Sequence, residues 1–334
     1  MRRKVTIDDI ARETELSRGT VSRAMNDRPD ISRATKQRVL QACRKLNYAP
    51  SFAARCLATG RGFALIALVR DLRDPHAAAI LSGAVRRAGK AGYLIHPVEL
   101  PDSPEEAGSA IERFISGRVD GVLVCEPLSE AAHRTLTEVI GARPVLHTYE
   151  APPSASFVAP DWREAGRAAA RFVSRNGQKR VLFVDDGVRA AAREGFLEST
   201  AAEHVHVEAV SAESVRHGPR AFGERLEGAD GIVTVGVSAA RTACLAAAGA
   251  GCWPGRQISI LSIGDGPCAT HIRPTLSAID VNPSEIGARA TEGILKRLDG
   301  EAPLPGTAEL VGPRLIERES TRRPGDARPR PKRR

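Results

Sequence analysis

Apolar residues recur at helical spacing through the first 46 positions of the chain. Between Thr6 and Asn26 this spacing predicts a short helix, a tight break and a second helix that opens at Ser17. A third helix is predicted over Ser32 to Leu46, and Thr6, Ser17 and Ser32 are all suitable N-caps. The apolar positions of the third helix are expected on one face: Val39, Leu40, Cys43 and Leu46. Three short helices of this size predict a helix-turn-helix unit.

From Phe63 onwards the pattern changes to apolar strands that alternate with amphipathic helices. A first series of strands is expected at residues 63–69, 93–98, 121–125 and 144–149. After a segment rich in Pro and Ser, a second series follows at residues 180–184, 205–210, 231–235 and 258–263. Such alternation predicts parallel sheets covered by helices on both faces. Two successive units of this kind predict two lobes, with a cleft between the carboxyl ends of their strands.

The changes in hydrophobic pattern and composition along the chain predict four regions. The helix-turn-helix domain takes residues 1–49, a hinge helix and linker take 50–62, the two-lobed core takes 63–321, and a basic tail takes 322–334. The tail is broken by proline and is predicted to be disordered. It lacks leucine heptads, so we expect dimers and no tetramer-forming coil.

The charge of the chain is concentrated at its two ends. Residues 1–62 carry a net charge of +8, residues 63–321 carry −5, and residues 322–334 carry +6. This division favours nucleic-acid contact through the ends over a uniformly basic packaging protein. The chain also has no apolar stretch long enough for a membrane helix or an export signal, so a cytoplasmic protein is predicted.

The second helix of a helix-turn-helix unit enters the major groove with its N-terminal residues facing base edges. Arg18 and Arg23 are the expected base readers, because a guanidinium can bond guanine O6 and N7 together. Short polar side chains suit phosphate oxygens, which position a protein without reading sequence. The predicted major-groove set is Ser17, Arg18, Gly19, Thr20, Ser22, Arg23 and Asn26.

The sequence resembles the lactose repressor family from about residue 5 to about residue 319. The resemblance rests on TVSRAMN, LNYAP and AARCLA in the first 60 residues, and on GRVDGVLV, SAIDVNPSEIGARATEGILKRL and PRLIERES later. It implies a hinge helix over residues 51–58 that orders on operator DNA. In that helix Leu57 would wedge into the minor groove, Ala54 would pack against its dimer mate, and Arg55 would lie near phosphate.

The resemblance also implies a core that is like periplasmic sugar-binding proteins, dimerises, and binds a small effector between its lobes. The chain would cross between lobes near residues 159–161, 280–282 and 301–307. Several family positions differ here. Glu15 stands at the turn where glycine is usual, and Gly236 and Val237 replace the usual Asn-Asp pair.

Sugar hydroxyls need convergent polar partners, and an unpaired buried polar group costs on the order of 1–3 kcal/mol. These departures therefore argue against a typical neutral hexose, or indicate that effector control has been lost. The candidate effector residues are His76, Tyr149, Arg193 and Asp265, and Trp162 could stack on a ligand ring. For each, a role without any ligand remains an equal alternative.

No phosphate loop, nucleophile with a neighbouring base, or metal-ligand spacing is found, so neither catalysis nor a metal or cofactor is expected. The six cysteines are scattered and predict neither zinc nor disulfides. The predicted function is a homodimeric, ligand-responsive transcriptional regulator, most simply a repressor, on a pseudo-palindromic operator. The alternatives are a regulator that has lost its effector response and a non-specific architectural DNA-binding protein.

Overall fold

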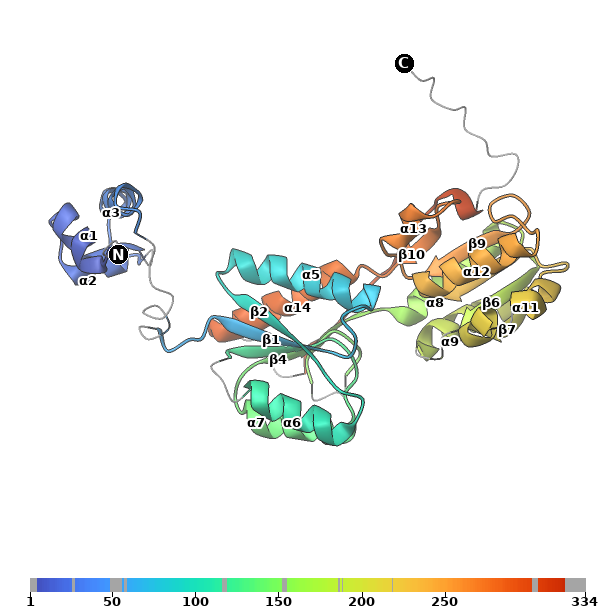
Figure 1. The fold of residues 1–334 in the computed structure, drawn as a ribbon, viewed down its shortest axis with the longest axis horizontal. Coiled ribbons are helices and arrows are strands. Elements are labelled where there is room, and N and C mark those ends of the chain that lie inside the picture. The colour runs from blue at the N-terminus through green and yellow to red at the C-terminus, as the bar shows by residue number, and fades with distance from the viewer. Residues whose placement is uncertain are drawn as a thin grey trace, which may run out of the picture. The chain divides into compact units, whose positions relative to one another are not determined.

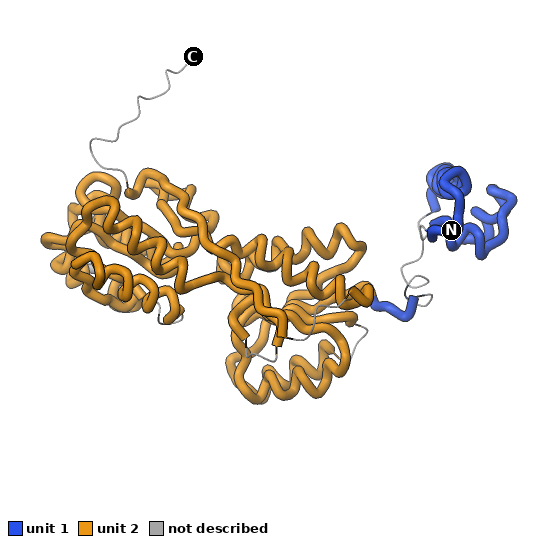
Figure 2. Tube along the Cα trace, turned by 180° about the vertical axis from the view of Figure 1, so that it is seen from behind, with its two compact units in different colours: residues 1–62 blue, residues 63–334 orange. Residues whose placement is uncertain are grey.

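The computed structural model divides into two compact units, residues 1–62 and 63–334 (Figure 2). It describes residues 5–25, 28–48, 56, 59–115, 119–151, 155–185, 187, 189–217, 219–301 and 306–321. The predicted DNA contacts Asn26, Ala54, Arg55 and Leu57 and the tail 322–334 lie outside these ranges. No helix within the described ranges is long and apolar enough to cross a bilayer.

The first unit contains the three predicted helices, α1 (Ile7–Thr14), α2 (Arg18–Met25) and α3 (Arg33–Lys45). Their starts follow the predicted caps. The Thr20 amide donates to Ser17 Oγ at 3.0 Å, and the Thr35 amide donates to Ser32 Oγ at 3.2 Å. The buried apolar residues of the unit are Ile10, Val21, Ala24, Val39 and Ala42. Each helix contributes to this small core, so the three helices fold as one unit.

Two details of this unit needed the structure. At the turn between α1 and α2, Glu15 itself adopts the left-handed conformation, at φ 51° and ψ 34°. The expectation that Leu40 faces the core is wrong, since its side chain is 45% exposed. The buried face of α3 passes through Val39 and Ala42, and Leu40 lies about 100° further round the helix from Val39.

The second unit contains two lobes, each built on a six-stranded sheet (Figure 1). Lobe 1 contains β1 (Ala64–Val69), α5 (Pro75–Lys90), β2 (Leu94–Glu99), α6 (Pro104–Ile115), β3 (Gly121–Val124), α7 (Glu130–Ile140), β4 (Val145–His147), β5 (Phe157–Pro160), α14 (Pro283–Leu298) and β11 (Ala308–Val311). Lobe 2 contains α8 (Trp162–Arg175), β6 (Arg180–Asp185), α9 (Ala190–Ala202), β7 (His206–Ser211), α10 (Ala212–His217), α11 (Pro219–Arg225), β8 (Gly231–Val235), α12 (Val237–Gly249), β9 (Ser259–Ile263), α13 (Cys268–His271), β10 (Ser277–Asp280), β12 (Arg314–Ile316) and the 3-10 helix η1 (Glu319–Thr321).

The two sheets have the same strand order, β11-β5-β4-β3-β1-β2 and β12-β10-β9-β8-β6-β7. The strand pairs are parallel except for β12, which runs antiparallel to β10. The predicted parallel sheets are therefore confirmed with this one exception. In each sheet the strand order reverses beside the first strand of the lobe, between β1 and β3 and between β6 and β8. Ligands of open α/β sheets bind at such switch points, beyond the carboxyl ends of the strands.

Helices cover both faces of each sheet, and the fully apolar strands supply both cores. In lobe 1, α5 and α14 pack on the face that carries Leu65 and Ala67, and α6 and α7 on the face that carries Ile66 and Leu68. Lobe 2 repeats the pattern, with α8 and α9 on one face and α10, α11 and α12 on the other.

Glycines let two helix pairs approach until their backbones touch. A Cβ built on Gly287 of α14 would lie 2.0 Å from the Ile80 carbonyl oxygen of α5. A Cβ on Gly195 of α9 would lie 2.1 Å from the Arg163 carbonyl oxygen of α8. Only glycine fits at these contacts, which position α14 and α8 immediately after the chain has changed lobes.

The chain crosses between lobes three times. The first crossing is at Asp161, between β5 and α8, and the second lies between β10 and α14, as predicted. The third was predicted at residues 301–307, and this is wrong. Because β11 pairs with β5 of lobe 1, the chain stays in that lobe until residues 312–313 and then enters β12.

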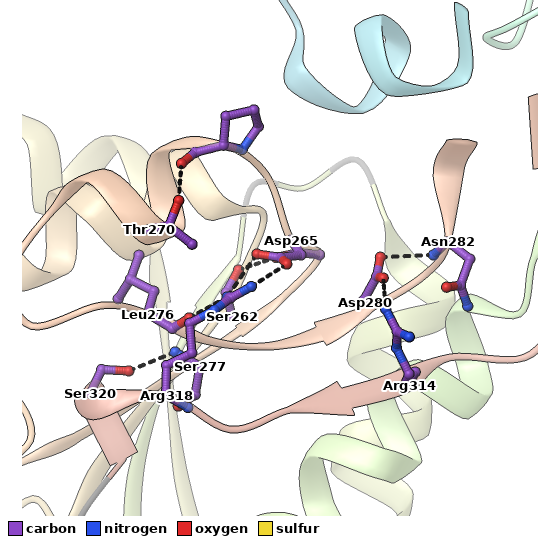
Figure 3. A network of polar contacts seen from close by, with 12 residues as sticks. Ser262, Asp265, Thr270, Leu276, Ser277, Asp280, Asn282, Arg314, Arg318 and Ser320 are labelled. Atoms are coloured by element: carbon purple, nitrogen blue, oxygen red, sulfur yellow. Dashed lines mark hydrogen bonds and ion pairs between the residues drawn. The ribbon is translucent and has the colours of Figure 1, made fainter. Parts of the chain in front are cut away.

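The three crossings are joined by hydrogen bonds. The Asp161 amide donates to the Val311 carbonyl at 3.1 Å, and Asn282 Nδ2 donates to the Gly312 carbonyl at 3.0 Å. Asp280 accepts from the Asn282 amide and pairs with Arg314 across the second and third crossings (Figure 3). The crossings therefore form one connected hinge between the lobes.

Candidate effector cleft and nucleic-acid interface

The exposed face of α2 carries the predicted base readers. The side chains of Arg18 and Arg23 are 70% and 55% exposed, whereas Val21 and Ala24 on the opposite face are buried. Each arginine has an exposed carboxylate neighbour: Asp8 Oδ1 lies 3.8 Å from Arg18 Nε, and Arg23 Nη1 donates to Asp30 Oδ2 at 3.2 Å. Exposed pairs of this kind contribute little, about 0–1 kcal/mol, so DNA could replace them at small cost.

The small polar side chains of the predicted set lie around the same helix start. Ser17 Oγ and Thr20 Oγ1 lie 2.8 Å apart at the first turn of α2, Gly19 is exposed, and Ser22 is half-buried one turn later. A helix start with unsatisfied amides and short hydroxyls suits phosphate oxygens.

In the second unit, a cavity of about 350 Å³ lies between the lobes. Its walls are the segments that follow β1, β6, β8 and β9, together with Trp162 of α8 and residues of α10. The carboxyl ends of strands from both sheets therefore converge on one cleft, at the two switch points of strand order. We call this cavity the effector cleft.

Three side chains lie close together in the effector cleft. The His76 ring, at the start of α5, lies 5.5 Å from the Trp162 ring, and the Arg189 guanidinium carbon lies 4.9 Å from the centre of the same indole. Burial, with the Arg189 charge nearby, lowers the pKa of His76 to about 4. The imidazole is therefore neutral at physiological pH, and its ring nitrogens can donate or accept a hydrogen bond.

Asp265 lines the cleft but is held by another residue. Arg318 donates to both of its carboxylate oxygens, at 2.9 and 2.6 Å, and each side chain is 17% exposed (Figure 3). The same guanidinium donates to the Leu276 carbonyl at 2.5 Å. The pair therefore joins the loop after β9 to the segment after β12, and it occupies oxygens that a sugar hydroxyl would need.

The structure brings only two of the four candidate effector residues together. His76 and Asp265 line the effector cleft, whereas Tyr149 and Arg193 are not among its lining residues. Tyr149 lies on the α6 and α7 side of lobe 1, with its hydroxyl 2.9 Å from His147 Nδ1, and burial raises its pKa to about 12. Arg193 is 48% exposed and lies 3.6 Å from the Asp185 carboxylate.

Sequence reasoning missed three arginines of the effector cleft: Arg73, Arg189 and Arg216. A usable signal existed for the first two, because each follows within five residues of a predicted apolar strand, at the edge where ligands bind. No such signal marks Arg216, which is brought to the cleft by the short helix α10.

Comparisons with known proteins agree with this architecture. The family profile described as bacterial regulatory proteins, lacI family, matches residues 6–51, and that of a periplasmic binding protein-like domain matches residues 176–321. Catabolite control protein A of Staphylococcus aureus is 24% identical over 313 residues, which cover 89% of this chain and 93% of that protein. With other curated relatives the match is shorter, and the chain spans 52% to 62% of their length.

Solved structures share the fold. The lac repressor dimer bound to operator and the anti-inducer ONPF aligns with a TM-score of 0.75 at 18% identity, covering 96% of this chain and 100% of that one. A LacI family regulator from Arthrobacter sp. FB24 in complex with lactose aligns with a TM-score of 0.69 at 20% identity, covering 77% of this chain and 99% of that one.

A helix-turn-helix head on a two-lobed, periplasmic-binding-protein-like core is a distinct class of protein. This chain has that architecture: residues 6–51 match the profile of the lacI family of bacterial regulatory proteins, and residues 176–321 match the profile of a periplasmic binding protein-like domain.

Proposed function

We propose that the protein is a sequence-specific transcriptional regulator, most simply a repressor, that binds a pseudo-palindromic operator as a homodimer. One observation carries the proposal: the folded helix-turn-helix head presents Arg18 and Arg23 outward on α2, on the same chain as a hinged core with a cleft. Its partner is genomic DNA, so it acts in the cytoplasm.

In this proposal the two heads read two half-sites in the major groove. Arg18 and Arg23 bond base edges and Gly19 lies outward beside them, while Ser17, Thr20 and Ser22 position the helix on phosphates. The assignments of Asn26, Ala54, Arg55 and Leu57 stay predictions from the sequence, with Leu57 as the minor-groove wedge.

A ligand in the effector cleft would act through the hinge. Its walls come from both lobes, so a ligand that contacts both walls favours one separation of the lobes over another. A ligand that binds two states with different affinity shifts their populations, and it thereby changes operator affinity. The sugars and analogues seen with structural neighbours suggest a small polar effector.

The decisive experiment recovers genomic DNA fragments bound by the purified full-length protein and aligns the enriched sequences. A palindromic site is expected, and Arg23→Ala should relax base preference at one position of each half-site, costing about 1–3 kcal/mol. A uniform loss on all sequences would assign Arg23 to phosphate alone. Enrichment without any shared motif would refute sequence-specific regulation and favour an architectural role.

Leu57→Ala tests the wedge separately. It should weaken operator binding and abolish bending of the operator, measured by the gel mobility of circularly permuted fragments. Bending that is unchanged in this variant would rule the wedge out.

A further inference from the structure

The wall of the effector cleft formed by lobe 2 is built to receive negative charge. The helix α12, 13 residues long, begins at this wall, and its first three residues, Val237, Ser238 and Ala239, all line the cavity. The first intrahelical bond runs from the Ala240 amide to the Gly236 carbonyl, so the three earlier amides have no partner within the helix. Gly236 provides no side-chain cap, and the first turn holds no acidic residue.

The backbone before α12 leaves room for a ligand at these amides. Gly236 has φ 86°, and a Cβ built on it would meet no heavy atom within 4 Å. Its carbonyl is turned toward Thr234 Oγ1, at 3.4 Å, and the Gly264 carbonyl accepts from Ser262 Oγ at 2.7 Å. Buried hydroxyls of β8 and β9 thus donate to both carbonyl oxygens, and the first three residues of α12 line the cavity beside them.

The charged side chains that line the effector cleft differ in whether they have a polar partner within the protein. Each of its three carboxylates has a partner: Asp71 is chelated by Arg73, Asp74 accepts from the His76 amide at 2.7 Å, and Asp265 is paired with Arg318. By contrast, Arg216 is exposed and makes no hydrogen bond or ion pair with any residue in the described part of the chain.

Arg189 extends the cationic wall toward the aromatic groups. Its guanidinium lies over the face of Trp162 and brings a positive charge beside the indole. The His76 ring lies 5.5 Å from the indole ring and makes no side-chain hydrogen bond within the described ranges. A ring and an anionic group would therefore find adjacent partners in one cavity.

We propose that the effector is a small ring compound with an anionic oxygen group, either a phosphate or a carboxylate. The anionic group binds at the start of α12 between Arg189 and Arg216, and the ring lies against Trp162 and His76. Amide donors and guanidinium groups recognise oxyanions through charge-assisted hydrogen bonds. This inference rests on the proposed function, since it specifies the ligand of the effector cleft.

The test uses full-length protein and four probes: inorganic phosphate, glucose, glucose 6-phosphate and gluconate. Binding is measured by calorimetry and by the rise in thermal unfolding midpoint, against potassium chloride of equal ionic strength. At least one anionic probe should bind and glucose should not. Preference for the phosphorylated probes assigns a phosphate ligand, and preference for gluconate assigns a carboxylate.

Three variants locate the site. Arg216→Gln should weaken binding of the anionic probe about tenfold. Ser238→Asp places a carboxylate at the start of α12, which favours the helix but repels the anion, so binding should fall at least tenfold in a folded protein. Arg134→Gln removes an exposed arginine of α7 outside the cleft and should bind as wild type.

Glucose binding as tightly as its anionic derivatives, failure of all three anions to bind, or unchanged binding by both cleft variants would overturn the inference. Operator binding measured on the same samples separates the two proposals. If operator DNA is bound specifically and no anion is, the regulator stands and the ligand class is wrong. If anions bind and no operator does, the proposed function is wrong.

Discussion

Disrupting the ion pair between Asp265 and Arg318 gives the clearest test of how the effector cleft is built. Removing one partner of a buried pair costs about 3–5 kcal/mol, because the other charge is left without compensation. Each side chain here retains 17% exposure, which lets water relieve part of that penalty. We therefore expect Asp265→Asn and Arg318→Met each to lower the free energy of unfolding of the core by about 2–4 kcal/mol.

The double variant should be less destabilised than the two single changes added together. With both groups removed no unpaired charge remains, and residues in direct contact couple by about 0.5–3 kcal/mol. The assay is urea unfolding of the full-length protein, followed by circular dichroism, with the slope of the transition compared among variants. Exposed Arg134→Gln is the matched control and should change stability by less than about 0.5 kcal/mol.

Additive effects, with a coupling energy below about 0.5 kcal/mol, would refute the structural role of the pair. Asp265 would then be free to act on a ligand. A coupled pair would show that Asp265 stabilises the structure of the cleft. Ligand specificity would then depend on Arg189, Arg216 and the start of α12.

Three further predictions follow from the backbone and the histidines. Gly287→Ala should destabilise the core by more than about 3 kcal/mol, since its Cβ would lie 2.0 Å from a carbonyl oxygen of α5. The control Gly89→Ala, whose Cβ would meet nothing within 4 Å, should be neutral or stabilising. Equal urea unfolding midpoints for the two variants would contradict this prediction. Glu15→Gly should stabilise the first unit by about 0.5–1 kcal/mol, because it relieves a left-handed residue; slower amide hydrogen exchange in α1 and α2 is the readout, and faster exchange would refute it. The pKa values of His76 and His147 are both lowered to about 4, so between about pH 6.5 and 4 the unfolded chain binds protons that the folded core excludes, and the free energy of unfolding should fall as the pH drops through this range. His147→Asn should make the free energy of unfolding depend less steeply on pH. An unchanged slope would show that the burial of this histidine is not responsible.

Local patterns in the sequence were enough to predict the class of the protein. Helical spacing and the caps Thr6, Ser17 and Ser32 predicted three helices, and apolar runs between helices predicted two sheets covered on both faces. These signals are readable because capping and burial act over a few residues. The same reasoning located two lobe crossings, and the first ends at Asp161, the N-cap of α8, whose carboxylate accepts from the Glu164 amide.

The composition of the effector cleft could not be predicted in that way. Asp71 and Asp265 meet in one cavity although they are far apart in the chain, and Asp265 is held by an arginine 53 positions later. The third crossing was predicted at the wrong place because only the pairing of β11 with β5 shows that β11 belongs to lobe 1. Which strands pair, and which loops therefore share an edge, depends on packing of the whole sheet.

The sequence by itself determined the three helices of the first unit, the two series of alternating strands and helices, and the outward arginines of α2, because periodicity and capping are local. The tertiary structure alone decided which charges line the effector cleft and which of them are paired with each other. Electrostatic partners are set by distance in space, and the parallel strands bring together chain segments that the sequence keeps apart.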